Sequence, residues 1–353
     1  MTLEKMGQYT IDEMIGQMLI VGFDGLILNE NDKIINQISK GLVGGVILFE
    51  KNLINGNTEK NIKNPEQLQQ LINSLKKNSK IPLFISIDQE GGQVARLNEN
   101  NGFYSSFSQK YLGKINDIEL TRKYSRNMSK ILFDLGINLN FAPVVDLNLN
   151  IFNPVIGAKE RSFSSDSKKV YELSKIIIEE HKNNNVYCVI KHFPGHGSAN
   201  QDSHIGFVDV TNCWKEVELE PFKLLIDNNK VNFIMTAHIF NSTIDVNYPA
   251  TLSYNTINVK LRNELNYQGI VVSDDMGMAA ITDNYTLEKS IELAINASVD
   301  VLVFGNNLNY DDEIILKVHS IIKKLVIENK IKFSRIEESF QRILKAKNGL
   351  NNN

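Results

Sequence analysis

Eight short apolar runs, spaced along a chain of 353 residues, most strongly limit what this sequence can fold into. Each run is almost continuously apolar rather than alternating, which is typical of parallel strands that are covered on both faces. The runs are Met18–Phe23, Gly45–Phe49, Leu83–Ile87, Leu139–Val145, Tyr187–Ile190, Asn232–Thr236, Gly269–Ser273 and Val299–Phe304.

Between the runs, apolar residues recur at three- and four-residue spacing, the pattern of an amphipathic helix. Helices are expected over Ile11–Gln17, Pro65–Lys77, Asp117–Asp134, Ser167–Asn183, Trp214–Asn228, Thr256–Leu265, Leu287–Ala297 and Asp312–Glu328. Repeated alternation of strand and helix over this length predicts an α/β fold, a closed (β/α)8 TIM barrel. A doubly wound open sheet is the alternative.

The chain contains no linker or low-complexity tract, so residues 1–353 are expected to form a single barrel domain. An extra C-terminal helix is predicted over Ser334–Asn348, and about residues 1–10 and 349–353 are expected to be loosely ordered. The asparagine-rich stretch Asn52–Asn64 has no apolar periodicity, which predicts an exposed loop.

Charge and cysteine content exclude several classes of function. The formal net charge is -3 and the pI is about 6.1, so the chain has no basic surface for nucleic acid or an anionic membrane. The two cysteines, Cys188 and Cys213, do not form a disulfide framework. The first apolar run is too short and broken for a signal peptide or a membrane span. A cytoplasmic monomer is expected.

Ionisable residues follow five successive predicted strands, at the end where barrel enzymes carry their reactive groups. A purely structural barrel gives no reason for such an arrangement. The ionisable residues are Asp88, Glu90 and Arg96 after the third run, Asp146 after the fourth, Lys191 and His192 after the fifth, His238 after the sixth, and Asp274 and Asp275, with Met276 beside them, after the seventh.

The densest cluster is Lys191–Gly197, followed closely by Asp202 and His204. Pro194 prevents continuation of the strand, and the glycines of this segment allow a sharp turn. If the loop is extended at Asp202, its carboxylate can accept a hydrogen bond from one imidazole nitrogen of His204 and so fix the tautomer. Such a dyad can shuttle a proton. The alternative is that these histidines are ordinary surface residues.

Neither a metal nor a cofactor is expected. His196, His204, His238 and Asp274 are residue types that bind zinc, but no two of them have the close spacing of a ligand pair on one strand or helix. The chain also lacks a Walker loop, a Gly-x-Gly-x-x-Gly motif after a strand and a Gly-x-Ser-x-Gly elbow. Carboxylates with basic residues at a barrel mouth suit cleavage of a glycosidic bond.

Several segments together closely resemble the family 3 glycoside hydrolases, and within that family the bacterial β-N-acetylhexosaminidases that recycle peptidoglycan. The segments are KHFPGHG at 191–197, DSH at 202–204, DQEGG at 88–92, NFAPVVD at 140–146, RSFS at 161–164, MTAHI at 235–239 and SDDMGM at 273–278. The resemblance implies hydrolysis of terminal β-linked N-acetylglucosamine (GlcNAc) with retention of configuration. The implied substrate is a GlcNAc-containing disaccharide or muropeptide.

The resemblance also implies roles for individual residues. Asp274 would be the nucleophile, and His204 the general acid and base, oriented by Asp202. Asp88, Arg96, Arg161, Lys191 and His192 would bind the sugar hydroxyls, with His238 and Met276 near the site. Asp275 is expected to be a structural ion pair or cap, because adjacent strand residues point to opposite faces. Ser198, Gln93 and Ala95 depart from the usual family pattern.

Three alternatives stay open at this point. A β-N-acetylglucosaminide phosphorylase would use phosphate in place of water, which a neutral histidine would not repel. A β-glucosidase of the same family would lack the DSH loop that is present here. A silent sugar-binding barrel would bind wall fragments without turnover, although the presence of both Asp274 and His204 argues against it.

Overall fold

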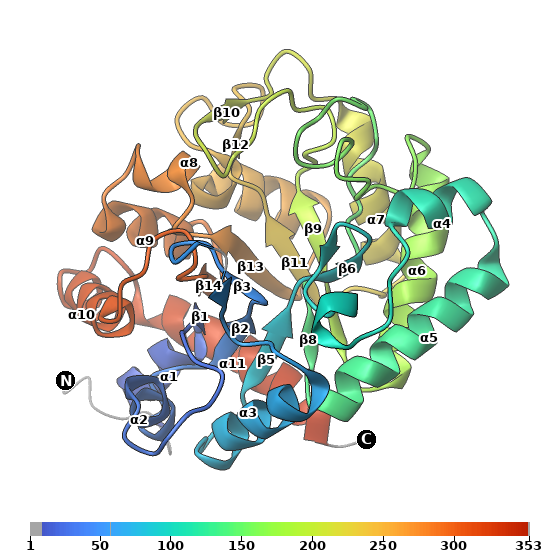
Figure 1. The fold of residues 1–353 in the computed structure, drawn as a ribbon. Coiled ribbons are helices and arrows are strands. Elements are labelled where there is room, and N and C mark those ends of the chain that lie inside the picture. Colours follow the sequence, from blue (N-terminus) through green and yellow to red (C-terminus); the bar gives the residue numbers. More distant parts are fainter. Residues whose placement is uncertain (1–8, 57, 352–353) are drawn as a thin grey trace.

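The computed structural model describes residues 9–56 and 58–351, and within them eight parallel strands close into a barrel (Figure 1). Around the barrel the strands follow the order β1-β14-β13-β11-β9-β8-β5-β2. Their bounds are β1 Leu19–Gly22, β2 Gly45–Leu48, β5 Phe84–Ile87, β8 Leu139–Asn140, β9 Tyr187–Phe193, β11 Phe233–Thr236, β13 Ile270–Asp275 and β14 Val301–Phe304. The predicted (β/α)8 barrel is confirmed, and the open sheet is wrong.

Each of the eight apolar runs overlaps a barrel strand, and six of the strands agree with the expected ends within two residues, but the other two differ more. The predicted strand Leu139–Val145 ends at Asn140. Pro143, which follows a cis peptide bond, has no N–H to donate to a neighbouring strand. By contrast, β9 continues through Lys191 and His192 to Phe193, and the Lys191–His192 peptide bond is also cis.

The helices surround the barrel (Figure 1). They are α1 Ile11–Gln17, α2 Lys33–Ser39, α3 Pro65–Lys77, α4 Gln109–Ile115, α5 Ile118–Leu135, α6 Ser167–Asn183, α7 Glu220–Asp227, α8 Ala279–Thr282, α9 Leu287–Asn296, α10 Ile314–Ile327 and α11 Phe333–Asn351. A π-helical segment covers Asn255–Glu264, and single 3-10 turns cover η1 Glu99–Asn101, η2 Glu216–Leu219 and η3 Ala250–Leu252. No helix in the described ranges has both the length and the apolarity needed to cross a membrane.

The predicted helices are confirmed with small shifts of their ends, except that the stretch Trp214–Asn228 divides into η2 and α7. The apolar spacing did not reveal α2, α4 and α8, which have seven, seven and four residues. Helices of one or two turns contain too few residues for the helical period to be read reliably. Their positions depend instead on contacts with the rest of the barrel.

Short paired strands lie in loops outside the barrel sheet. The pairs are β3 Lys51–Asn52 with β4 Thr58–Glu59, β6 Gln89–Gly91 with β7 Val94–Ala95, and β10 Val208–Asp209 with β12 Ile239–Phe240. The expected exposed loop over 52–64 is wrong for Asn52 and for residues 60–62, which are buried. Lys60 donates to Asn306 O at 2.6 Å and pairs with Asp24 at 2.9 Å. These bonds hold this part of the loop against the barrel.

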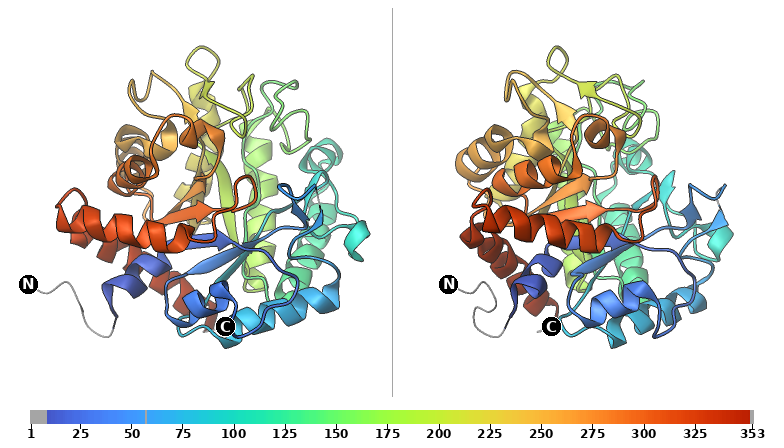
Figure 2. Two further views of the ribbon diagram at one scale, coloured as in Figure 1. Left: turned by 60° about the vertical axis from the view of Figure 1, so that its left-hand side comes forward. Right: turned by 90° about the vertical axis from the view of Figure 1, so that its left-hand side faces the viewer.

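The last helix closes the amino-terminal end of the barrel, beside α1 (Figure 2). The buried Lys347 Nζ donates to Gln17 Oε1 at 2.5 Å and to Gly44 O at 2.6 Å, and it lies 4.7 Å from the centre of the Phe84 ring. The helix extends to Asn351, so the loosely ordered tail expected over 349–353 is wrong for residues 349–351. Residues 1–8 and 352–353, also expected to be loosely ordered, lie outside the described residues.

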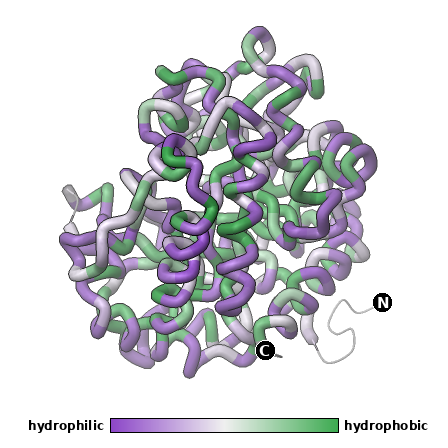
Figure 3. The backbone as a smooth tube through the Cα atoms, turned by 90° about the vertical axis from the view of Figure 1, so that its right-hand side faces the viewer, coloured by the Kyte–Doolittle hydropathy of each residue, from purple (hydrophilic) through white to green (hydrophobic). Residues whose placement is uncertain are grey.

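The hydrophobic core combines the barrel interior with the layer between strands and helices. Figure 3 shows apolar segments inside and alternating polar and apolar residues along the outer helices. Phe84 and Phe233 meet edge to face across the barrel interior, with ring centres 5.6 Å apart. This packed interior leaves the carboxyl ends of the strands as the place where polar side chains can gather.

Candidate active site

A pocket of about 330 Å³ opens at the carboxyl ends of the barrel strands. Seven of the residues expected at the site line it, from four different strand ends and the loops that follow them. They are Asp88, Arg96, Arg161, Lys191, His192, His204 and Asp274. The structure therefore brings together residues that lie up to 186 positions apart in the sequence, from Asp88 to Asp274.

Four charged side chains form a buried cluster on one wall of the pocket. Arg161 holds Glu90 through two parallel bonds, Nε to Oε2 at 2.7 Å and an η-nitrogen to Oε1 at 2.8 Å. Lys191 Nζ lies between Glu90 at 2.6 Å and Asp88 at 2.8 Å. Burial alone would raise the pKa of Glu90, but the charges of Arg161 and Lys191 outweigh it and lower the pKa to about 2.

Arg96 is held more loosely on the same wall. Its guanidinium lies 3.4 Å from Asp88 and 3.5 Å from Glu50, and 5.5 Å from the centre of the Phe49 ring. Burial of Asp88 acts to raise its pKa, but Lys191 and Arg96 lower it. Because Asp88 and Glu90 stay ionised at neutral pH, this wall of the pocket offers both carboxylate acceptors and cationic donors to one ligand.

His192 is oriented by Asp146, which sequence reasoning placed at a strand end but did not assign to the site. The His192 Nδ1 lies 2.6 Å from Asp146 Oδ2. The Asp146 carboxylate also accepts from the His196 N–H at 2.7 Å. Arg161 can only donate to His192 Nε2, 3.3 Å away, so the His192 proton belongs on Nδ1.

Glu90 is a second site residue that the sequence left without a role. Its spacing of two residues from Asp88 is the signal that could have identified it, because residues two apart in a strand lie on the same face.

Asp202 and His204 make the contact that their spacing predicts. His204 Nδ1 lies 2.7 Å from Asp202 Oδ1, which also accepts from the His204 backbone N–H at 2.9 Å. The carboxylate places the imidazole proton on Nδ1 and leaves Nε2 free for exchange with a ligand. His204 lines the pocket, and its side chain is 43% exposed, so this imidazole is accessible from solvent.

Asp274 and Asp275 end strand β13 and differ in their contacts. Asp275 accepts from the N–H groups of Gly277 at 2.9 Å and Gly305 at 3.0 Å, which agrees with the expected capping role. The register of β13 against β14 shifts between Val272 and Asp275. This irregularity lets both carboxylates line the pocket, an outcome that regular strand alternation would not allow.

The charge state of Asp274 follows from its neighbours. Burial acts to raise its pKa, but His238, His192 and His204, together with the Asp275 N–H at 2.8 Å, lower it overall. Asp274 is therefore an ionised carboxylate at neutral pH. By contrast, burial raises the pKa of Asp275.

His238 and Met276, both expected near the site, lie behind the pocket wall. His238 Nε2 is 2.9 Å from the Asp275 carbonyl oxygen, and Nδ1 is 2.8 Å from Thr251 Oγ1. A carbonyl can only accept, so His238 carries its proton on Nε2 and supports the end of β13. Met276 is 2% exposed and belongs to the hydrophobic core, whereas Met278 lines the pocket.

A metal centre was weighed for His196, His204, His238 and Asp274. Within the described residues, no group of three or more histidine, cysteine, aspartate or glutamate side chains is placed to hold a metal ion. These residues have other contacts instead. His196 Nε2, for example, lies 3.4 Å from Ser203 Oγ.

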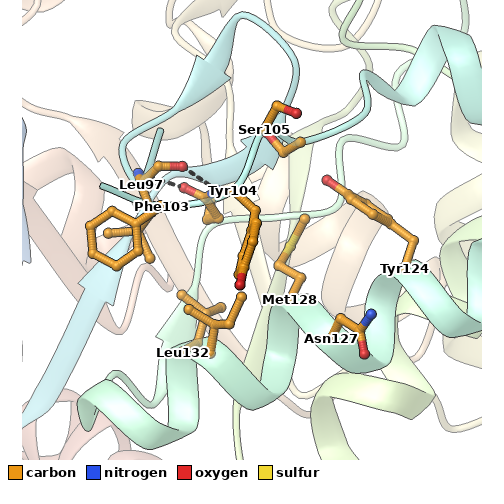
Figure 4. Close-up of a pocket in the computed structure, with 11 residues that line it drawn as sticks. Leu97, Phe103, Tyr104, Ser105, Tyr124, Asn127, Met128 and Leu132 are labelled. Carbon is orange, nitrogen blue, oxygen red and sulfur yellow. Dashed lines mark hydrogen bonds between the residues drawn. The ribbon is translucent and has the colours of Figure 1, made fainter. Parts of the chain in front are cut away.

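A second, smaller pocket of about 160 Å³ lies between the segment 97–106 and α5 (Figure 4). Tyr124 and Met128 of α5 line it, together with Gln89 of β6. The Gln89 amide makes two bonds to Leu97, accepting from N at 2.9 Å and donating to O at 3.1 Å. These bonds fix the β6–β7 hairpin, which carries Glu90 of the main pocket and directly follows Asp88.

Comparison with known proteins supports a specific family. The model of the glycosyl hydrolase family 3 N-terminal domain matches residues 10–346. A β-hexosaminidase of Haemophilus influenzae is 34% identical over 295 residues, covering 82% of this chain and 79% of that protein. β-Hexosaminidase A of Pseudoalteromonas piscicida is 38% identical over 289 residues, which are 75% of this chain and 46% of that protein. The chain thus spans about half the length of that relative.

A solved structure agrees with these matches. The family 3 β-N-acetylglucosaminidase from Paenibacillus sp. str. FPU-7 superposes with a TM-score of 0.88 at 32% identity. The match covers 97% of this chain and 63% of the Paenibacillus chain. With a family model over nearly its whole length and β-hexosaminidases among its relatives, this chain belongs to glycosyl hydrolase family 3.

Proposed function

We propose that this protein is a retaining, exo-acting β-N-acetylglucosaminidase that removes terminal β-linked GlcNAc from peptidoglycan fragments. The main support is one pocket that holds an ionised aspartate, Asp274, and an accessible imidazole, His204, whose tautomer is set by Asp202. Family membership and the similarity to β-hexosaminidases support the reaction class.

In the first half of the proposed reaction, Asp274 attacks the anomeric carbon of GlcNAc. The bond between that carbon and the aglycone oxygen breaks as the bond to the Asp274 carboxylate forms. His204, protonated on both nitrogens, gives its Nε2 proton to the departing oxygen. Asp202 stabilises the charged imidazole before this transfer and orients the neutral ring after it.

In the second half, water replaces Asp274 at the same carbon. The neutral His204 accepts a proton from the water through Nε2, and the carboxylate of Asp274 is released. Two displacements at one carbon retain the β configuration. Asp88, Glu90, Arg161, Lys191 and His192 are proposed to bind the sugar hydroxyls through the buried charged wall.

The proposed activity is tested with chromogenic glycosides. We expect release of 4-nitrophenol from the β-GlcNAc glycoside and none from the β-glucoside. In phosphate buffer the product is expected to be free GlcNAc. Accumulation of GlcNAc 1-phosphate would instead identify a phosphorylase, and binding of GlcNAc without turnover would identify a silent sugar-binding barrel.

Two lysines support a peptidoglycan fragment as the substrate. Lys51 and Lys159 line the pocket, and within the described residues neither forms an ion pair, whereas Arg96, Arg161 and Lys191 are all paired with carboxylates. The charge of Lys159 also lowers the pKa of Asp202, so this lysine lies on the side of the dyad. Unpaired cations there favour an aglycone with a carboxylate, such as N-acetylmuramic acid.

Replacing Lys159 by methionine is therefore expected to act on the aglycone alone. The KM for GlcNAc-β-1,4-N-acetylmuramic acid should rise about 10-fold, the effect of losing one charge-assisted contact of about 1.4 kcal/mol. The KM for neutral chitobiose should not change. Lys168→Met, which alters an exposed lysine outside the pocket, is the control. Equal effects on both substrates would contradict a carboxylate-binding role.

A further inference from the structure

The loop that carries the Asp202–His204 dyad is held at its base by one buried carboxylate. Glu218, in η2, has no exposed surface. Its Oε2 accepts from the backbone N–H of Gly197 at 3.0 Å and of Ser198 at 3.4 Å, and its Oε1 accepts from Ser198 Oγ at 2.6 Å. Every one of these donors belongs to the segment that leads from β9 to the dyad.

The surroundings leave little freedom at this contact. A Cβ atom on Gly195 would lie 2.6 Å from the Glu218 Cβ, and Gly195 has a φ of 118°, so only glycine fits there. Trp214 Nε1 donates to Pro194 O at 3.2 Å, from the segment just before Glu218. The segment 214–218 therefore lies alongside residues 194–198 and fixes their position.

Beyond this base the loop is much more exposed. The His204 side chain is 43% exposed and Ile205 is 81% exposed. The dyad is internally bonded, but its own contacts do not set the direction in which the loop leaves the barrel. Contacts at 196–200 set that direction. Asp146 accepts from the His196 N–H, and Asn153 donates to the His196 carbonyl at 2.7 Å. Glu218 then binds residues 197–198, and Asn150 Nδ2 donates to Ala199 O at 2.9 Å.

The buried Glu218 carboxylate lowers the stability of the fold more than a neutral side chain would, which a purely structural contact does not explain. Glu218 has no Lys or Arg partner within the described residues, and the like charge of Asp146 also acts to raise its pKa. Burial raises the pKa of Glu218 to about 7. A buried carboxylate without a cation costs stability unless its hydrogen bonds compensate. Three of its four hydrogen bonds come from the dyad loop, and the fourth comes from the Lys215 N–H at 3.2 Å, so most of this compensation depends on the position of the loop.

We propose that Glu218, acting through Ser198, is a positioning residue that sets the reach of His204 to the glycosidic oxygen. This assignment rests on the proposed function, because it concerns the general acid of that reaction. Ser198 follows Gly197 directly, and its hydroxyl makes the shortest of the bonds between Glu218 and the loop.

The test measures kcat/KM for aryl β-GlcNAc glycosides whose leaving groups differ in acidity. A 2,4-dinitrophenyl group departs without a proton, whereas a phenyl group needs the general acid. In Glu218→Gln and Ser198→Ala, kcat/KM for the phenyl glycoside should fall roughly 10- to 100-fold, since small misplacement of a catalytic group has effects of this size. The dinitrophenyl glycoside should lose less than about threefold, because its cleavage does not use the acid.

Two sets of variants make the result specific. Ser167→Ala and Glu220→Gln each remove a second Ser–Glu hydrogen bond. Glu220 is two residues from Glu218, but this bond does not involve the dyad loop. These variants should therefore not change the rate for either glycoside. His204→Ala provides the reference for complete loss of the acid. In the double variant of Glu218 and Ser198, the two losses should not add, since both act through one bond.

Equal losses for both leaving groups, or no loss, would overturn the positioning role. Ser198→Ala removes only a hydroxyl and decides the question even where Glu218→Gln does not fold. If the unchanged protein turns over aryl GlcNAc glycosides, a flat response of these variants refutes this inference alone. If it does not turn them over, the proposed function fails first, and the positioning role falls with it.

Discussion

Replacing Asp274 by alanine should lower kcat for aryl β-GlcNAc glycosides by roughly 10⁴- to 10⁶-fold, the scale on which loss of a nucleophile acts. Asp274 lines the pocket, its pKa is lowered overall, and its carboxylate accepts from the Asp275 N–H. Asp275, the other carboxylate at this strand end, is bound to the N–H groups of Gly277 and Gly305 and is not expected to replace it. The fold should be retained, because within the described residues the Asp274 side chain hydrogen-bonds only to the N–H of the next residue.

Azide separates a nucleophile from a merely supporting residue. In Asp274→Ala, azide fits the space left by the carboxylate and attacks the anomeric carbon from the same face. It should restore turnover and yield the α-glycosyl azide, which NMR identifies. Asp283→Asn, a change at an exposed aspartate of the following loop, is the control and should be fully active. Full activity of Asp274→Ala would remove the proposed nucleophile.

Replacing Arg161 by methionine should produce the largest loss of stability. Arg161 is paired with Glu90 in two parallel bonds, and the side chains are 8% and 1% exposed. Removing one partner leaves a buried charge that Lys191 alone must balance. The free energy of unfolding at pH 7, measured with urea, should fall by about 3–5 kcal/mol. Glu90→Gln added to this variant should recover part of the loss, since it removes the unbalanced charge.

The pH dependence of stability should change with the same substitution. The pKa of Glu90 is about 2 in the folded protein, against an ordinary value of 4.5. Because the folded pKa is lowered, the stability that Glu90 contributes is fully present above pH 4.5 and is lost as the pH falls toward 2. Without Arg161 the folded pKa rises, so this contribution shrinks and acid unfolding begins at a higher pH.

An exposed ion pair serves as the control for this experiment. Lys130 and Asp134 pair at 2.9 Å on the surface of α5, with side chains 65% and 53% exposed. Lys130→Met should change the free energy of unfolding by less than about 0.5 kcal/mol, since water and salt screen such pairs. A loss below about 1 kcal/mol in Arg161→Met would show that the charged wall does not carry this stability.

The fold and the dyad were predictable because their signals are local. Each barrel strand is buried on both faces, so its apolar residues stand next to one another in the sequence. Asp202 and His204 are two positions apart, and their contact depends only on an extended turn. The short helices and the buried residues 60–62 were missed, because distant contacts such as that of Lys60 with Asn306 stabilise them.

The support around the site could not be read in this way. Glu90 and Asp146 were visible as polar residues at strand ends, yet their partners Arg161 and His192 lie 71 and 46 positions away. Glu218 follows no barrel strand and lies in a stretch that resembles an ordinary amphipathic helix. Its contact with Ser198 joins two loops whose approach the sequence pattern does not encode.

The sequence by itself determined the closed barrel, the end of the barrel that carries the chemistry and most of the residues proposed to act there, because burial and strand direction follow from local patterns. Only the tertiary structure decided which charges meet. It paired Arg161 with Glu90, let both aspartates of β13 line the pocket and set Glu218 beneath the dyad loop. The physical reason is that ion pairs and hydrogen bonds act over a few ångströms in space, whatever the separation along the chain.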